Sequence, residues 1–171
     1  MLVAETAAAE NRLPHPQQWL PVNDGVMGGL SQSRYYEQAG YAGVFAGNVS
    51  LENNGGFASV RAPMRLEPAA HDLQLHLKIS GDGKRYSLRL LTERTLDGIA
   101  YAATINTVEG QISEHHLAAA DFTAVWRGRV VSGAPPLQWQ DVRQIGLMIS
   151  EKQEGAFQLR LLSLDCATEP K

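Results

Sequence analysis

The stretch that decides the fold is 73-LQLHLKISGDGKRYSLRLL-91. Apolar and polar residues alternate through 73–80, and Tyr86, Leu88 and Leu90 resume the alternation after a glycine-rich break. A period of two places alternate side chains on opposite faces of a strand, so both segments are predicted to be strands with one buried face. The break, 81-GDGK-84, has the composition of a tight turn, which predicts that the two strands pair as a hairpin.

The same signal recurs elsewhere in the chain. Further strands are predicted at 99–106, 144–150 and 156–164, and shorter ones within 41–51 and 56–63. The nearly continuous apolar run of 144–150 is typical of a strand buried on both faces. Helical periodicity is weak, and the best helical segment is a single turn within 116–122. Many short strands separated by Gly, Asn and Pro predict an all-β fold with very little helix, an antiparallel β-sandwich, with a closed barrel as the alternative.

Length and composition limit the organisation and the partners of the chain. Its 171 residues fit one domain, which we bound at 19–167, between an N-terminal arm at 1–18 and a tail at 168–171. The formal net charge of −3 argues against a nucleic-acid binder. The lone cysteine, Cys166, excludes an internal disulfide and is expected to behave as a small apolar side chain.

No apolar run of about 18 residues, the length that spans a membrane, is present. The N-terminal sequence lacks the features of a signal or transit peptide, so we expect a cytoplasmic protein. His115 and His116 are adjacent and would point to opposite faces of a strand, which disfavours a shared metal. A zinc site is therefore not expected, and no other metal or cofactor is assigned, although β-sandwich sugar-binding domains often hold a structural calcium.

Two glycine-rich loops carry polar residues. The first, 24-DGVMGGLS-31, is not followed by a helical pattern, so a phosphate loop is disfavoured and the polar residues are expected to shape the turn. In the second, 52-ENNGGFASVR-61, the Asn-Gly pair predicts a hairpin turn. Arg61 shares its alternation with Phe57, so it is expected to point inward and to line a cleft.

The later segment 125-VWRGR-129 joins an aromatic ring to Arg127 and Arg129. Together with Arg61 and Lys84, these arginines are a candidate basic patch for an anion or an acidic partner, although exposed arginines also occur without such a role. The acidic residues Asp24, Glu52 and Asp82 lie in turn sequences, and no nucleophile motif is present. We therefore expect a protein that is not an enzyme.

The order of these motifs is more specific than any one of them. The blocks are NDGVMGGLS (23–31), FAGNVSLENNGGFASVR (45–61), GDGKRYSLRL (81–90), DFTAVWRGR (121–129) and QIGLMISEKQEGAFQLRL (144–161). Across 19–166, this order resembles the complex I intermediate-associated protein 30 family. The resemblance implies a galactose-binding-like β-sandwich of jelly-roll type. It also implies a chaperone-like role in the assembly of NADH:ubiquinone oxidoreductase, with no catalytic residues to carry over.

The leading hypothesis is a non-catalytic binding protein that recognises a protein partner, such as a subunit of a respiratory or other redox complex. We expect the site where the motif loops meet at one rim of the sandwich. The candidate residues are Asn23, Asp24, Ser31, Asn53, Asn54, Arg61, Asp82, Lys84, Tyr86, Trp126, Arg127 and Arg129. The alternative is a carbohydrate or small-ligand binding module, which requires Trp126 or Tyr86 to be exposed beside its basic neighbour.

Overall fold

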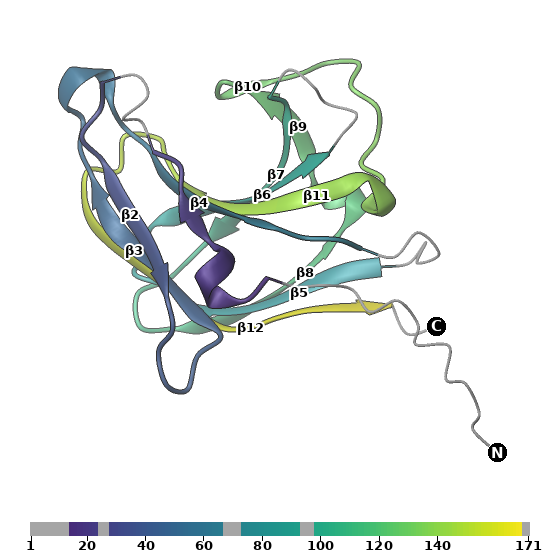
Figure 1. Cartoon of the computed structure of the whole chain (residues 1–171), viewed down its shortest axis with the longest axis horizontal. Helices are drawn as coiled ribbons and strands as arrows, with labels where there is room; N and C mark the ends of the chain where they lie inside the picture. Colours follow the sequence, from purple (N-terminus) through teal and green to yellow (C-terminus); the bar gives the residue numbers. More distant parts are fainter. Residues whose placement is uncertain (1–13, 24–27, 67–72, 93–97, 169–171) are drawn as a thin grey trace.

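The computed structural model describes residues 14–23, 28–66, 73–92 and 98–168, which form two antiparallel β-sheets packed face to face (Figure 1). The seven-stranded sheet has the order β1 (Leu20–Pro21), β4 (Ala58–Pro63), β11 (Val142–Ile149), β6 (Arg85–Thr92), β7 (Ala100–Asn106), β9 (Thr123–Trp126), β10 (Arg129–Val130). The five-stranded sheet has the order β2 (Gln32–Tyr36), β3 (Gly43–Val49), β12 (Gly155–Thr168), β5 (Leu73–Ser80), β8 (Ile112–Ala118). The predicted all-β sandwich is confirmed, and the barrel alternative is not.

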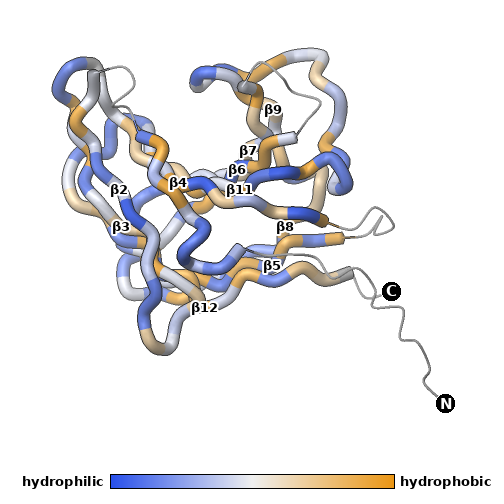
Figure 2. The backbone as a smooth tube through the Cα atoms, in the orientation of Figure 1, coloured by the Kyte–Doolittle hydropathy of each residue, from blue (hydrophilic) through white to orange (hydrophobic). Residues whose placement is uncertain are grey.

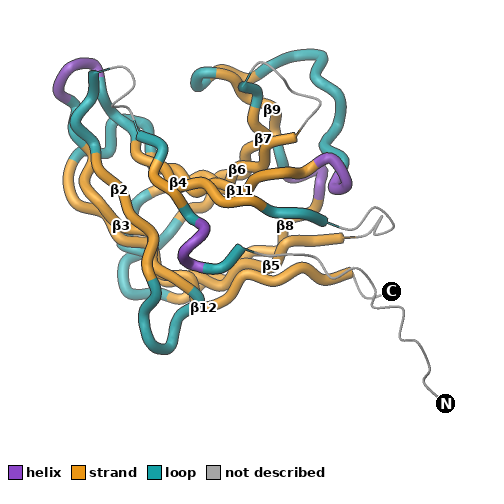
Figure 3. Tube along the Cα trace, viewed as in Figure 1, coloured by secondary structure: helices purple, strands orange, loops and turns teal. Residues whose placement is uncertain are grey.

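Helix in the described residues is limited to single 3₁₀ turns (Figure 3). These turns are η1 (Pro16–Gln18), η3 (Glu52–Asn54), η4 (Ala119–Asp121) and η5 (Trp139–Asp141). The turn η4 lies inside the segment that the sequence marks as its best helical candidate, so that prediction is confirmed. No helix in this part of the chain is long and apolar enough to cross a membrane.

The core fills the space between the two sheets with one set of alternating side chains from each strand. Leu75, Leu77 and Ile79 of β5 face Leu88 and Leu90 of β6 across this space, and all five are almost fully buried. Hydrophobic and hydrophilic positions accordingly follow one another along the strands (Figure 2). Burial of such side chains stabilises a fold by roughly 25 cal/mol per Å² of apolar surface, so the period-two pattern is the main source of stability.

The prediction that 81-GDGK-84 forms a hairpin turn is wrong. β5 pairs with β12 and β8 in one sheet, whereas β6 pairs with β11 and β7 in the other, so the segment crosses from sheet to sheet. The crossing is fixed by side chains that a short-range pattern does not reveal. Thr107 Oγ1 accepts a hydrogen bond from Gly83 N (3.0 Å), and its side chain fills the space where a Cβ on Gly81 would lie.

The hairpin predicted from Asn54-Gly55 is also wrong. β3 belongs to the five-stranded sheet and β4 to the seven-stranded one, so the η3 turn lies in a second crossing between sheets. The left-handed conformation also lies at another residue than predicted, since Asn53 has a φ of 54° whereas Gly55 has a φ of −66°. Turn residues specify local backbone geometry, but they do not specify which strands pair.

The close approach of β2 to β3 generates a prediction about stability. A Cβ on Gly47 would lie 2.0 Å from the carbonyl oxygen of Gln32, so Gly47→Ala requires the two strands to separate. We expect the free energy of unfolding to fall by about 2 kcal/mol or more, measured by urea denaturation. Asn48→Ala is the matched control because the neighbouring Asn48 side chain is exposed, and it should change stability by less than about 0.5 kcal/mol. Equal stability of the two variants would contradict the strand packing.

Candidate functional site

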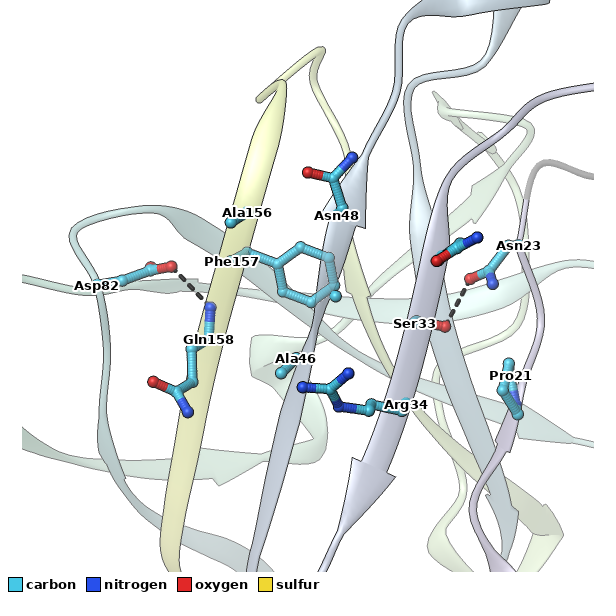
Figure 4. A pocket seen from close by; sticks show the side chains of 12 residues that line it. Pro21, Asn23, Ser33, Arg34, Ala46, Asn48, Asp82, Ala156, Phe157 and Gln158 are labelled. Carbon is cyan, nitrogen blue, oxygen red and sulfur yellow. Dashed lines mark hydrogen bonds between the residues drawn. The ribbon is translucent and has the colours of Figure 1, made fainter.

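A pocket of about 920 Å³ lies on the outer face of the five-stranded sheet, over β2, β3 and β12 (Figure 4). Its lining residues are Pro21, Asn23, Gln32, Ser33, Arg34, Ala46, Gly47, Asn48, Asp82, Ala156, Phe157 and Gln158. Asn23 and Asp82 are the predicted site residues that line it. Both act at its walls as structural hydrogen-bond acceptors.

Asn23 joins the two sheets where β1 and β2 lie next to each other. Its Oδ1 atom accepts a hydrogen bond from the backbone N–H of Ser59 in β4 (3.0 Å) and lies 2.6 Å from the hydroxyl of Ser33 in β2. The Ser33 hydroxyl is also 2.8 Å from the carbonyl oxygen of Ser59. The amide oxygen of Asn23 is therefore used inside the protein, and its NH₂ group is the part that can reach a ligand.

Ser31, at the other end of the segment that joins β1 to β2, also makes hydrogen bonds within the protein. It is buried, its hydroxyl lies 3.3 Å from the carbonyl oxygen of Ser50, and it accepts a hydrogen bond from Ser50 N (2.9 Å). The arrangement fastens the start of β2 to the end of β3, which matches the turn-shaping role expected of Ser31. Asp24, its partner in the predicted loop, lies outside the described residues.

Asp82 and Tyr86 form a clamp at the crossing between β5 and β6. The Asp82 carboxylate accepts hydrogen bonds from the Tyr86 hydroxyl (2.9 and 3.0 Å to its two oxygens), Lys84 N (3.1 Å) and Gln158 N (2.9 Å). Tyr86 is only 2% exposed and packs against Phe45 and Phe157. Burial, together with the nearby Asp82 charge, raises the pKa of the Tyr86 hydroxyl. Tyr86 is therefore a core residue and offers no ring face to a ligand.

The remaining members of these loops are spread out. The Lys84 ammonium donates to the carbonyl oxygen of Ala156 and so is tied to β12. Asn53 is exposed at η3 on the crossing that follows β3, and the Asn54 backbone lies beside it. Asn53 does not line the pocket described above, and the Asn54 side chain lies outside the described part of the structure.

Trp126, Arg127 and Arg129 lie at the β9–β10 turn, at the opposite edge of the seven-stranded sheet from β1. Trp126 is 41% exposed, and the Arg127 guanidinium lies 4.7 Å from the centre of its ring. Arg127 has a φ of 48°, so the turn itself places the guanidinium over the indole. The predicted residues therefore fall into separate groups and do not meet at one rim (Figure 1).

Arg61 does not point inward, which corrects the sequence-based expectation. β4 begins at Ala58, and Ala58, Val60 and Ala62 form its core-facing set, so Arg61 lies on the outer face of the seven-stranded sheet. Phe57 precedes the strand and does not set its register. Desolvation by partial burial lowers the pKa of Arg61. Arg89, on the same face, has its pKa lowered by burial and by the Arg61 charge.

Four polar residues that line the pocket were not predicted from the sequence. Gln32, Arg34, Asn48 and Gln158 lie on the outer face of β2, β3 and β12, in register with one another. The Arg34 guanidinium lies 5.3 Å from the Tyr36 ring centre, and Tyr36 accepts a hydrogen bond from Gln158 Nε2 (3.4 Å). For Gln158 the available signal was the alternation of 156–164, whose polar positions must lie on one outer face.

Groups typical of catalysis or of metal binding are sparse in the described part of the chain. No cluster of three or more His, Cys, Asp or Glu residues able to hold a metal occurs there. His115 and His116 point to opposite faces as predicted, and His116 stacks on His76 with ring centres 4.1 Å apart. Burial raises the pKa of the Cys166 thiol to about 12, which disfavours the nucleophilic thiolate.

The order of the sequence motifs and the two-sheet sandwich can now be compared with known protein families. The model of the complex I intermediate-associated protein 30 family matches residues 8–161. The chain belongs to this family. The resemblance inferred from the motif order is confirmed, and no curated protein matches the chain.

Solved structures with this fold include carbohydrate-binding modules. The family 11 carbohydrate-binding module of the cellulase Lic26A-Cel5E of Clostridium thermocellum has a TM-score of 0.62 at 10% identity, covering 96% of this chain and 98% of that one. An exo-β-agarase has a TM-score of 0.56 at 9% identity, covering 91% of this chain. This family member spans only 24% of the agarase chain. At these identities the likeness concerns the fold.

The Asp82 clamp generates the second prediction. Asp82→Asn replaces a carboxylate oxygen with an NH₂ group that cannot accept from Gln158 N or Lys84 N. We expect the free energy of unfolding to fall by about 2 kcal/mol, because hydrogen bonds to a charged group are lost in a partly buried place. The matched control is Glu37→Gln, which removes the same charge from an exposed position. If urea denaturation gives the same stability for both variants, the clamp does not hold the crossing.

Proposed function

We propose that this protein is a non-catalytic recognition domain that acts in the assembly of a respiratory complex of the complex I type or of another redox complex. Membership of the complex I intermediate-associated protein 30 family over residues 8–161 is the observation that carries the proposal. The described residues contain no cluster of three or more His, Cys, Asp or Glu side chains that could hold a metal, which fits binding better than metal-dependent catalysis. The partner is proposed to be a protein.

Exposed apolar side chains support a protein partner. Leu20 of β1 is 65% exposed and Val130 of β10 is 71% exposed, and these strands form the two edges of the seven-stranded sheet. Trp126 lies next to β10 with Arg127 over its ring. Aromatic and arginine side chains are enriched at protein interfaces. Figure 1 shows β9–β10 and the η3 segment rising from opposite ends of this sheet on its outer side.

The third prediction concerns capture of this partner. Full-length tagged protein, expressed in its native organism, should recover subunits of a membrane-associated redox complex by affinity purification and mass spectrometry. The double variant Leu20→Ser, Val130→Ser should lose about 80% of this recovery or more, because interface cores depend on a few apolar anchors.

A matched control is available elsewhere on the surface. Val108 and Ile112 are each 57% exposed, so Val108→Ser, Ile112→Ser makes a similar apolar-to-polar change outside the seven-stranded sheet. This control should recover the partner like wild type. Consistent absence of redox-complex subunits from the wild-type sample would overturn the proposed function.

A carbohydrate-binding function is the second candidate. The pocket over β2, β3 and β12 supports it, because the side chains of Gln32, Arg34, Asn48 and Gln158 there offer amide and guanidinium donors to hydroxyl groups. Tyr86 is buried and cannot stack on a sugar, whereas Trp126 is exposed but lies beside the other sheet. The pocket residues, and not the predicted aromatic ones, therefore carry this candidate.

The fourth prediction tests this candidate by thermal shift and calorimetry with a panel of neutral oligosaccharides. Ligand at 100 times its Kd should stabilise the protein by about 2.7 kcal/mol, which is a measurable rise in Tm. Arg34→Ala and Gln158→Ala should each weaken binding at least fivefold if the pocket is the site, whereas Lys78→Ala, on the same sheet outside the pocket, should not. No stabilisation by any oligosaccharide at millimolar concentration would exclude the second candidate.

A further inference from the structure

The outer face of the seven-stranded sheet carries two arginines side by side with a glycine between them. Gly146 of β11 pairs with Arg61 of β4 on one side and with Arg89 of β6 on the other. A Cβ on Gly146 would lie 3.5 Å from Arg61 Cγ and 3.8 Å from Arg89 Cβ, so both side chains border the space above the glycine. The glycine thus lets two cationic side chains share one patch of the sheet surface.

No acidic side chain within the sheet balances these charges. The seven strands, as the structure bounds them, contain no Asp or Glu. The salt bridges recorded among the described residues join Lys78 to Glu114 and Arg85 to Glu151, and neither uses Arg61 or Arg89. Two like charges in partly buried positions without a counter-charge repel each other. Such a pair is unusual unless an anion binds between them.

One donor of the pair is buried without a partner. Arg89 Nε is inaccessible to solvent and makes no hydrogen bond to any described residue. Nearly all buried polar groups in proteins are hydrogen-bonded, so an exception requires an explanation. The residues directly opposite the arginines on the far side from β11 are apolar, Leu20 for Arg61 and Ala102 for Arg89. They offer the guanidinium groups no side-chain acceptor.

We propose that Arg61 and Arg89 form an oxyanion-binding site on the outer face of the seven-stranded sheet, whose ligand is a side-chain carboxylate of the protein partner. The planar fork of a guanidinium matches the two oxygens of a carboxylate, and two forks above one glycine can hold one such group from both sides. The choice of a protein carboxylate rests on the proposed function, and the exposed Leu20 and Val130 at the sheet edges favour it over a free ion. Charge complementarity assigns an acidic segment to the centre of the face and apolar contacts to its edges.

The fifth prediction tests the site directly by NMR of the arginine Nε–H groups, using the capped peptide acetyl-Asp-Asp-Asp-Asp-amide as the probe. The Nε–H signals of Arg61 and Arg89 should shift saturably with the peptide but not with sodium chloride at equal ionic strength. Arg61→Gln should weaken binding of the peptide at least fivefold. Arg61→Lys keeps the charge but loses the planar fork, so it should also weaken binding at least threefold.

Arg85→Gln is the matched control, because it removes the same charge from an exposed position in the same sheet, where Arg85 is already paired with Glu151. It should bind the peptide like wild type. Arg61→Lys serves as the more conservative variant if Arg61→Gln fails to fold. Absence of a saturable shift in wild type, or an equal shift with chloride, would overturn the oxyanion site.

Partner capture separates this inference from the proposed function. Arg61→Gln and Arg61→Lys should reduce recovery of the partner relative to Arg85→Gln, with the larger loss at low salt. If the peptide binds but both Arg61 variants recover the partner normally, the carboxylate assignment is overturned while the assembly role stands. If wild type recovers no partner although the peptide binds, the proposed function fails and with it the assignment of the carboxylate to a partner, whereas the oxyanion site stands.

Discussion

The structure depends on a constraint at its crossings: a segment that leaves one sheet must be held before it enters the other. At the crossing between β5 and β6 this is done by the Asp82 carboxylate, which accepts from Tyr86 in one sheet and from Gln158 N in the other. The Tyr86 ring continues into the core against Phe45 and Phe157. The Asp82 carboxylate thus helps to fix the crossing and to position the aromatic part of the core. Asn23 likewise joins the two sheets between β1 and β2.

The sequence predicted the fold class and the faces of its most regular strands. Alternation at β5, β6 and β12 was read correctly because burial on one face imposes a period of two. The strand pairings were not predicted, because 81-GDGK-84 and Asn54-Gly55 specify a turn and carry no information about distant partners. β2 and β8 were missed since their faces are mixed: His115 and Ser113 of β8 occupy inward positions beside Leu77 and Ile79 of β5.

The candidate sites were harder to predict than the fold. The loop residues chosen from the motifs are largely engaged in the protein's own hydrogen bonds, as Asn23, Ser31 and Asp82 show. Family-specific loop residues can be retained for architecture as readily as for binding. The residues now proposed to meet ligands lie on strands, and pairs such as Arg61 and Arg89 become neighbours only through a third strand, β11, which follows them by more than fifty residues in the chain.

The positions of β11 and β12 have a consequence for the order in which the chain folds. Each lies inside its own sheet, β11 between β4 and β6 and β12 between β3 and β5, yet they are the last two strands of the sequence. During synthesis, the neighbouring strands β3, β4, β5 and β6 each keep one unpaired edge until β11 and β12 have left the ribosome. Pairings between distant segments form slowly and expose strand edges to aggregation. A protein proposed to assist the assembly of others therefore passes through a vulnerable nascent state of its own, which ends only when its final strands are inserted.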